Sequence, residues 1–236
     1  TIRLLDKQTK IVNSHFKEAI GDDEDRVNRD LSSIHKKFKL FLNRDLAKEG
    51  INKPRNILKI LLEELHSAFP HAPAYQNVDF FEKFFINIDN ERYFPIRGHG
   101  LGMANELTTL MQIAIFRLTR DRSGLDRNSC TGRFKNDDAL IAFTERNFFN
   151  DYNDEEDEVL DGLGLIRRKE KSFCTRGGFF ITERYYPEHF NRKESYYRSQ
   201  LLRTLLCVNV THAKSQISSI IHVRQDLIEE YIQEIQ

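Results

Sequence analysis

Apolar residues recur along this chain at two different spacings, which predict a mixture of helices and short strands. Apolar residues three or four positions apart predict helices over residues 1–21, 31–47, 54–68, 105–120, 145–163, 195–210 and 213–236. Apolar and aromatic runs bounded by turn residues predict strands over residues 80–88, 91–94 and 179–183, and a hairpin over residues 133–143. Helices and short strands mixed in this way predict an α+β domain with an antiparallel sheet.

The hairpin at residues 133–143 has a polar, turn-forming triplet, Asn136-Asp137-Asp138, between two short apolar arms. Its tip would present two carboxylates. Because two adjacent carboxylates repel each other unless a cation lies between them, this arrangement favours Mg²⁺. Asn-Asp-Asp is also a common surface turn, so an ordinary turn without chemistry is the alternative interpretation.

Basic and acidic residues are equally frequent, with 36 of each among 236 residues, and the formal net charge is +0. Overall charge therefore gives no support to nucleic-acid binding, which would depend on local patches. The length fits one large domain or the core of a larger one. Thr1, rather than Met, stands first and indicates a segment of a longer polypeptide.

The three cysteines, Cys130, Cys174 and Cys207, are widely spaced and form no CxxC pair. This spacing argues against a zinc site and against a disulfide framework, and it fits a reducing cytosol. The sequence shows no apolar run of transmembrane length and no signal peptide.

Residues 97–103 form a glycine-rich loop that leads into the helix predicted from Asn105. Its alternate glycines allow a ligand to approach the backbone closely. The N–H groups at the start of the helix, together with Thr108 and Thr109, favour contact with phosphate or ribose. The spacing matches neither a P-loop nor a dinucleotide-binding fingerprint, and a flexible loop capped by Asn105 is the alternative.

A cluster of basic residues lies between the helix predicted over residues 145–163 and the strand predicted over residues 179–183. Its members are Arg167, Arg168, Lys169, Lys171 and Arg176. Such cations suit the leaving pyrophosphate of a nucleoside triphosphate, and a lysine among them could supply a proton. The alternative is a solvated run of charges, which is also our interpretation of the acidic runs at residues 22–25 and 154–158.

Asp30 is the candidate for a third metal-binding carboxylate, because we expect it at a junction between a strand and the helix predicted over residues 31–47. An aspartate directly before a helix is also a frequent N-cap, which is the alternative.

The order of these features resembles that of the palm of viral RNA-dependent RNA polymerases, over about residues 27–186. The resemblance is closest to the narnavirus, botourmiavirus and RNA-phage replicase group. Residues 30–33 are similar to motif A of that group, 97–109 to motif B, 136–143 to motif C, 162–173 to motif D, and 177–183 to the segment that follows. The resemblance implies a palm-like antiparallel sheet flanked by helices, with part of the fingers, in residues 1–186, and a helical, thumb-like segment in residues 187–236.

The resemblance also implies RNA-templated RNA synthesis by nucleotidyl transfer, in a viral replicase in the cytoplasm of an infected host cell. The cofactor would be Mg²⁺ or Mn²⁺, used in a two-metal mechanism. The partners would be the RNA template and product and nucleoside triphosphates. Asp30, Asp137 and Asp138 would bind the metal ions, and Lys171 would be the catalytic general acid. Contacts to nucleotide and RNA would come from Arg97, Gly100, Gly102, Asn105, Thr108, Thr109 and Lys169.

Two positions depart from the motifs of the group. Asn136 stands where glycine is usual, although Asn also accepts the left-handed backbone of a turn. The motif A region continues as Ile34-His35-Lys36-Lys37, without the second Asp that helps the family to select the ribose 2′-hydroxyl. Only 29 residues precede Asp30, too few for complete fingers. We therefore expect a fragment, one piece of a split polymerase with a partner chain, or a degenerate palm relative.

Two other classes of protein stay open. One is a catalytically inactive helical or palm-like scaffold or binding protein, in which Asp137 and Asp138 only form a turn. The other is a different metal-dependent phosphotransferase, although the chain has no P-loop or kinase pattern. A polymerase requires Asp30 and Asp137 to lie close together with the Gly100 loop alongside, whereas a scaffold has no such requirement.

Overall fold

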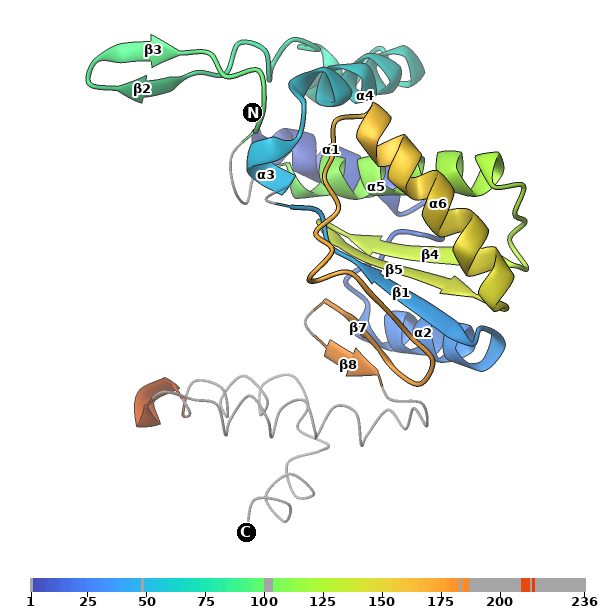
Figure 1. Ribbon diagram of the computed structural model, residues 1–236. Helices are drawn as coiled ribbons and strands as arrows, with labels where there is room; N and C mark the ends of the chain where they lie inside the picture. The colour runs from blue at the N-terminus through green and yellow to red at the C-terminus, as the bar shows by residue number, and fades with distance from the viewer. Residues whose placement is uncertain are drawn as a thin grey trace. The chain divides into compact units, whose positions relative to one another are not determined.

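The computed structural model describes residues 2–47, 49–99, 104–182, 184–186, 209–212 and 214 (Figure 1). The chain divides into two compact units, residues 1–182 and 183–236. In the second unit the description covers strand β8 (Arg184–Tyr186) and a few residues near 210. The helices predicted over residues 195–210 and 213–236 therefore lie almost entirely outside the described residues. No described helix is long and apolar enough to cross a membrane.

The first unit combines helices with short strands. Its helices are α1 (Ile2–Asn13), α2 (Glu24–Lys37), α3 (Glu49–Asn52), α4 (Arg55–Ala68), α5 (Asn105–Arg122) and α6 (Arg146–Gly162), with a 3₁₀ turn, η1, at Pro73–Tyr75. Its strands are β1 (Leu40–Arg44), β2 (Ile86–Ile88), β3 (Glu91–Tyr93), β4 (Cys130–Lys135), β5 (Asp138–Phe143), β6 (Phe173–Thr175) and β7 (Phe179–Ile181). The predicted α+β class is confirmed, and the helices predicted over residues 54–68, 105–120 and 145–163 correspond to α4, α5 and α6.

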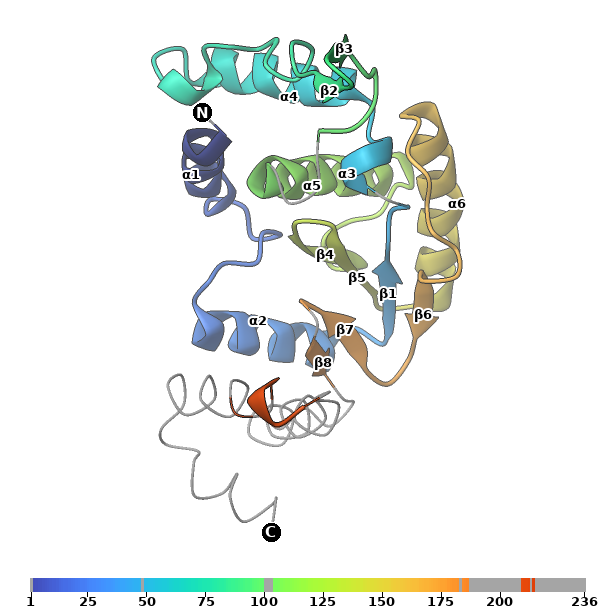
Figure 2. The ribbon, with the colours of Figure 1, turned by 90° about the vertical axis from the view of Figure 1, so that its left-hand side faces the viewer.

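Four strands form an antiparallel sheet in the order β4-β5-β1-β6. The pairing of β1 with β5 runs from Leu40 opposite Phe143 to Arg44 opposite Ala139. Helices α5 and α6 cover one face of this sheet and α2 lies on the other (Figure 1 and Figure 2). Because antiparallel strands run in opposite directions, the end of β1 and the start of β5 meet at one edge of the sheet.

Apolar side chains fill the space between the sheet and helices α5 and α6. The cluster contains Leu40, Leu42, Phe134, Ile141 and Phe143 from the strands and Ile113, Phe116 and Tyr152 from the helices. Side chains alternate along a strand, so Phe41 points to the opposite face. There its ring stacks on His35 of α2 at 5.3 Å and contacts Phe179 of β7 at 4.9 Å. Both faces of β1 are therefore covered.

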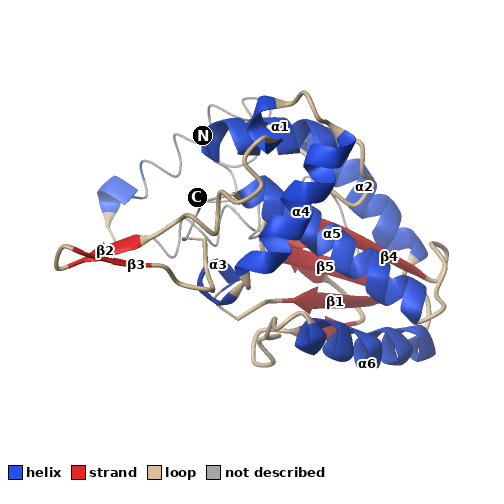
Figure 3. Cartoon of the chain, turned by 90° about the horizontal axis from the view of Figure 1, so that it is seen from above, coloured by secondary structure: helices blue, strands red, loops and turns tan. Residues whose placement is uncertain are grey.

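Helix α4 lies over α5 on the side away from the sheet, and α1 lies alongside α5 (Figure 2 and Figure 3). Leu5 of α1, Leu58 and Leu62 of α4, and Leu107 of α5 belong to one buried apolar cluster. Helix α5 therefore packs against other helices as well as against the sheet.

Strands β2 and β3 form a hairpin that projects away from the sheet (Figure 1). Its loop residues, Asp89 and Asn90, have positive φ angles of 52° and 68°, as a type I′ turn requires. The predicted turn between two strands is confirmed, although β2 is shorter than predicted. All six residues of the two strands are exposed.

The prediction of one helix over residues 31–47 is wrong in its second half. Helix α2 ends at Lys37, and the run Leu40-Phe41-Leu42 belongs to β1. Because these three residues are all buried, the strand lacks the alternation of apolar and polar residues that would distinguish it from a helix.

The N-terminal region also differs from prediction at two points. The first helix ends at Asn13 rather than near Gly21. The acidic run at residues 22–25 is not a loop throughout. Asp23 caps α2 by accepting a hydrogen bond from the Arg26 N–H, and two acids occupy the first turn, where the helix dipole favours negative charge.

Candidate active site

The turn between β4 and β5 presents the two predicted carboxylates. The hairpin is confirmed, with Lys135 paired to Asp138 and the turn formed by Asn136 and Asp137. Asn136 has a φ of 54°, the left-handed conformation expected for it. Its side-chain amide donates to Asp137 Oδ1 at 2.9 Å. Asp137 and Asp138 are both exposed at this edge of the sheet.

Helix α5 holds this turn from the buried side. Thr109 Oγ1 accepts a hydrogen bond from the Asn136 N–H at 2.8 Å. Gln112 Nε2 donates to the Asp137 carbonyl at 3.4 Å. Residues three apart share one face of a helix, so one face of α5 contacts both peptide groups of the turn. Thr109, predicted to contact nucleotide or RNA, is buried and engaged in holding the turn.

Asp45 is a carboxylate of this site that the sequence analysis missed. It directly follows β1, and the register of β1 and β5 puts it beside Asp138. Partial burial raises the pKa of the Asp45 carboxyl. The positive charges of Lys171 and Arg168 oppose that rise, and the negative charge of Asp137 adds to it. Asp45 therefore lies within electrostatic reach of Asp137. The signal that could have found it is the apolar run Leu40-Phe41-Leu42, which an acid follows three residues later.

The basic cluster lies along the segment that carries Asp45. The Arg168 N–H donates to the Asp45 carbonyl at 2.8 Å, and the Asp45 N–H donates to Ser172 Oγ at 3.0 Å. Lys169 and Lys171 are exposed in the turn between these contacts. The fold thus brings Asp45, Asp137 and the segment that carries the predicted lysines to the same edge of the sheet, although these three segments are far apart in sequence.

Asp30 does not take the predicted position. It lies within α2, one turn and more from the start of that helix, rather than at a junction after a strand. Its carboxylate forms an ion pair with Arg133, with 2.7 Å between Oδ1 and Nη2. The same guanidinium donates to the Gly132 carbonyl, on the side of Arg133 away from the turn. Asp30 is therefore neutralised along β4 and is not brought to Asp137.

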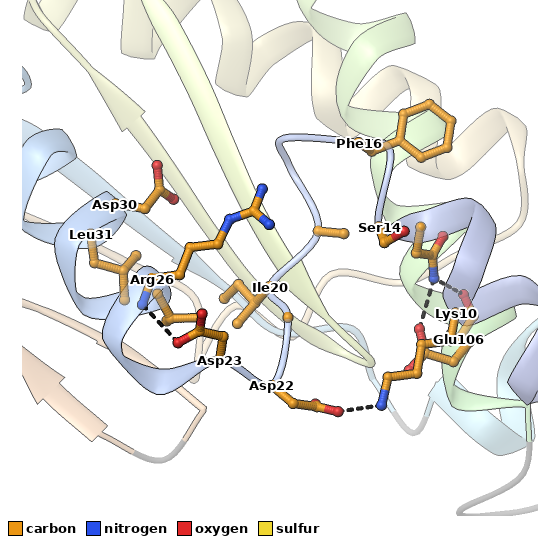
Figure 4. Close-up of a pocket in the computed structure, with 14 residues that line it drawn as sticks. Lys10, Ser14, Phe16, Ile20, Asp22, Asp23, Arg26, Asp30, Leu31 and Glu106 are labelled. Carbon is orange, nitrogen blue, oxygen red and sulfur yellow. Dashed lines mark hydrogen bonds and ion pairs between the residues drawn. The ribbon is translucent and has the colours of Figure 1, made fainter.

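Asp30 also lines a cavity of about 290 Å³ between α1, α2 and the start of α5 (Figure 4). Figure 4 shows Asp30 and Arg26 on one side and the ion pair of Lys10 and Asp22 on the other. The charged residues of the lining are four acids, Asp22, Asp23, Asp30 and Glu106, and two bases, Lys10 and Arg26. An excess of acids disfavours an RNA phosphate as the occupant.

The described part of the glycine-rich loop is hydrogen-bonded to the segment that follows β1. The Gly98 N–H donates to the Lys53 carbonyl at 2.8 Å, and Gly98 has a φ of 79°. A side chain there would meet the Ile51 carbonyl oxygen at 2.7 Å, so glycine is required. Arg97 donates to the carbonyls of Asn52 and Gly164, both at 2.8 Å.

Other residues predicted to contact nucleotide or RNA lie in this loop and in the first turn of α5, and those that the structure describes differ in their exposure. Gly100 and Gly102 lie outside the described residues. Asn105 is exposed at the first position of α5, and Thr108 is buried. Thr108 Oγ1 accepts a hydrogen bond at 2.7 Å from Lys53, a fully buried lysine in the segment after β1. Desolvation lowers the pKa of Lys53 to about 7, and the charge of Asp137 opposes this shift.

A buried ion pair lies directly beneath the site. Arg44, the residue before Asp45, donates to Glu156 Oε1 at 2.8 Å, and neither side chain is exposed to solvent. Glu156 also accepts from the Tyr152 hydroxyl at 3.0 Å and from Arg167 at 3.4 Å. The prediction that residues 154–158 form a solvated face is therefore wrong at Glu156. The basic residue Arg167 belongs to this interior network rather than to the exposed cluster.

The acidic residues fit one mode of magnesium binding. Among the described residues, no group of three or more His, Cys, Asp and Glu side chains could hold a metal ion. Mg²⁺ does not need such a cage, because it keeps several waters and often binds one or two carboxylates together with substrate phosphates. Asp45 and Asp137 are the candidates for such a pair, because they lie at the adjoining ends of the paired strands β1 and β5 and the negative charge of Asp137 contributes to the raised pKa of Asp45.

The comparisons with known proteins identify a fold. No protein-family model and no curated protein matches the chain. Among solved structures, it is similar to the crystal structure of the RNA-dependent RNA polymerase of a human picorbirnavirus, with a TM-score of 0.63 and 12% sequence identity. The similarity covers 89% of this chain and 45% of that chain. The chain thus has a fold like that of a viral RNA-dependent RNA polymerase and spans less than half the length of the polymerase compared. The narrower resemblance to the narnavirus group stays a prediction.

Proposed function

We propose that this chain carries the catalytic palm of a viral RNA-dependent RNA polymerase, and that it adds nucleotides to RNA under the direction of an RNA template. The observation that carries this proposal is the meeting of Asp45, Asp137 and the lysine-bearing segment at one edge of the sheet. The polymerase-like fold supports it. A scaffold function does not require these acidic and basic side chains to lie together at one exposed edge of the sheet.

Asp45 and Asp137 would hold Mg²⁺ or Mn²⁺, and Asp45 takes the role predicted for Asp30. Asp138 would contribute from its position beside Asp45. When bound, two such ions would activate the 3′-hydroxyl of the growing RNA and neutralise charge that develops on the leaving pyrophosphate. Exposure of Asp137 and Asp138 leaves this edge accessible to a triphosphate from solvent.

The basic residues would act on the triphosphate. Lys171 is exposed, and its charge reaches Asp45, so a phosphate bound near Asp45 would lie within its field. An ammonium group in that position can attract the triphosphate and give a proton to the pyrophosphate as it leaves. Lys169, two residues earlier in the chain, would contribute positive charge.

The start of α5 would contact the nucleotide and the RNA strands. Asn105 is exposed there and can bond a ribose hydroxyl, and Gly100 and Gly102 would permit a close approach of the template. Arg97, Thr108 and Thr109 would support this region through the backbone and side-chain bonds described above. We further propose that other polymerase segments, in the same or a partner chain, complete the RNA-binding channel.

Two measurements test this function. The first is template-directed incorporation of a labelled nucleotide into RNA with Mg²⁺ or Mn²⁺. The second is direct Mn²⁺ binding, followed by electron paramagnetic resonance. We expect Asp45→Ala and Asp137→Ala each to reduce incorporation to background and to weaken Mn²⁺ binding by at least about tenfold.

Asp30→Ala is the matched control, because it removes a carboxylate that is paired with Arg133 away from the turn. It should keep Mn²⁺ binding and incorporation within about threefold of the unmodified chain. The proposal is wrong if Asp30→Ala abolishes both signals while Asp45→Ala leaves them intact. If the chain neither binds Mn²⁺ nor incorporates nucleotide, the scaffold interpretation replaces it.

A further inference from the structure

One side-chain amide connects the two acidic segments of the candidate site. Gln112 Oε1 accepts a hydrogen bond from Arg44, the residue before Asp45. Gln112 Nε2 donates to the carbonyl of Asp137. Arg44 can only donate and a carbonyl can only accept, so the orientation of the amide is fixed by its two partners. Gln112 itself is fully buried on α5.

The Arg44 end of this connection is anchored in the interior. Its guanidinium is bound by Glu156 at 2.8 Å, and it lies 5.9 Å from the centre of the Phe134 ring. Glu156 is held in turn by Tyr152 and Arg167. Of the polar atoms of this pair, Arg44 Nε is buried without a hydrogen-bond partner. The pair still has little freedom to move, because displacement of either side chain leaves a charge unpaired in a medium of low polarity.

We propose that Gln112 is a positioning residue that sets the separation between Asp45 and Asp137, with the ion pair of Arg44 and Glu156 as its fixed support. This inference rests on the proposed function, because it assumes that these two acids bind the metal ions. Arg44 is the last residue of β1 and Asp45 directly follows it, so fixing the side chain of Arg44 on the buried face restrains the backbone of Asp45 at the site. The same amide fixes the peptide group of Asp137.

The expected consequence is a change in metal affinity. Two carboxylates that approach each other without a cation repel, so they separate unless the backbone holds them. Removing the amide that links the side chain of Arg44 to the backbone carbonyl of Asp137 would let the acids move apart and would weaken binding of the ion between them. Groups that orient metal ligands without touching the metal typically change its affinity by about 10- to 100-fold.

The test is a Mn²⁺ titration of the full chain, followed by electron paramagnetic resonance, with the thermal unfolding midpoint of each variant measured alongside. Gln112→Met keeps the size of the side chain and removes both hydrogen bonds. We expect it to raise the Kd for Mn²⁺ by about 10- to 100-fold. Asn13→Leu is the control, because Asn13 is also a buried amide that joins two elements, α1 and α5, through Glu106. It should lower the unfolding midpoint and leave the Kd within about twofold.

A second variant guards against misfolding. Replacing Arg44 with Met and Glu156 with Leu together exchanges the ion pair for apolar side chains, a change that interiors tolerate better than loss of one partner. This double variant should weaken Mn²⁺ binding as much as Gln112→Met does, and adding Gln112→Met to it should cause no further loss, because the three residues act through one connection.

Several results would contradict the inference. If the unmodified chain binds Mn²⁺ and Asp45→Ala does not, an unchanged Mn²⁺ affinity of Gln112→Met would overturn the positioning role of Gln112 and leave the proposed function standing. Equal weakening by Asn13→Leu would show a general loosening of the fold instead of positioning, and would also overturn it. Absence of Mn²⁺ binding by the unmodified chain would remove the metal site of the proposed function and this inference together.

Discussion

Lys53 is a charged residue in an apolar interior, and its environment makes the stability of the protein depend on pH. Its ammonium group is fully buried against Thr108, and desolvation lowers its pKa to about 7. In the unfolded chain the pKa of lysine is near 10.4. Between these two values the unfolded state binds a proton that the folded state does not, so stability rises with pH across this window and is constant below it.

Substitution of Lys53 should remove this dependence. We expect the unfolding free energy of the unmodified chain, relative to that of Lys53→Met, to increase by on the order of 2 kcal/mol from pH 7 to pH 9. Urea denaturation at several pH values measures it. Lys83→Met, at an exposed lysine, is the control and should follow the unmodified chain. Parallel curves for Lys53→Met and the unmodified chain would show that Lys53 stays protonated.

Local sequence pattern singled out Asp137 and Lys171 as candidates for the site but not Asp45, and the roles of all three stay a proposal. Asp137 was visible because its turn residues are adjacent in sequence and carry the hairpin signal themselves. Asp45 depends on the pairing of β1 with β5, about a hundred residues away along the chain, which local spacing does not encode. Local spacing also does not show that Asp30 is paired with Arg133, which lies about a hundred residues away along the chain.

Helix α5 holds the turn that carries Asp137, and two of its threonines have partners other than those predicted. The sequence indicated a helix whose first turn contacts phosphate through Thr108 and Thr109. Both hydroxyls are instead buried, and they bind Lys53 and the peptide of Asn136. Periodicity predicted the extent of this helix well, because most of its length is buried and regular. It did not predict which polar residues face inward, since that depends on the neighbouring elements.

The β4–β5 turn provides a test at the level of an element. Asn136 adopts a left-handed backbone that costs a residue with a Cβ roughly 1 kcal/mol, and glycine pays no such cost. We expect Asn136→Gly to keep the unfolding free energy within about 0.5 kcal/mol and Asn136→Ala to lower it by roughly 1 kcal/mol. Urea unfolding of the two variants compares them directly. Equal stability of the alanine and glycine variants would mean that the turn relaxes to another conformation.

For the whole molecule, the sequence predicted the class and the order of most elements, and the exceptions have a common cause. The predicted α+β class and the helices around the sheet are confirmed. Errors occur where tertiary burial overrides local pattern, as in β1, which is covered on both faces, and at Glu156, which is buried within an acidic run. The chain spans 45% of the polymerase to which it is similar, so this fold accounts for only part of such an enzyme.

The projecting β2–β3 hairpin should influence the behaviour of the molecule in solution. Phe94 and Ile96 beside it are 60% and 84% exposed, and Ile86 and Ile88 are exposed on its first strand. Exposed apolar residues next to free strand edges promote association between molecules. We expect the double variant Phe94→Asp with Ile96→Asp to reduce concentration-dependent self-association in sedimentation velocity. A double variant matched in charge and in apolar loss, Ile11→Asp on α1 with Ile60→Asp on α4, should have a smaller effect, and equal effects would contradict a role for the hairpin.

The adjacency of Arg44 and Asp45 has a consequence for protein engineering. Arg44 is buried in the interior, and Asp45, the next residue, lies at the edge of the sheet that faces solvent. A substitution in the interior that moves Arg44 would therefore also move Asp45. Stabilising substitutions introduced between the sheet and helices α5 and α6 would therefore also change the geometry of the candidate site. The apolar layer formed by Leu5, Leu58 and Leu62 on the far side of α5 is the safer place to introduce them.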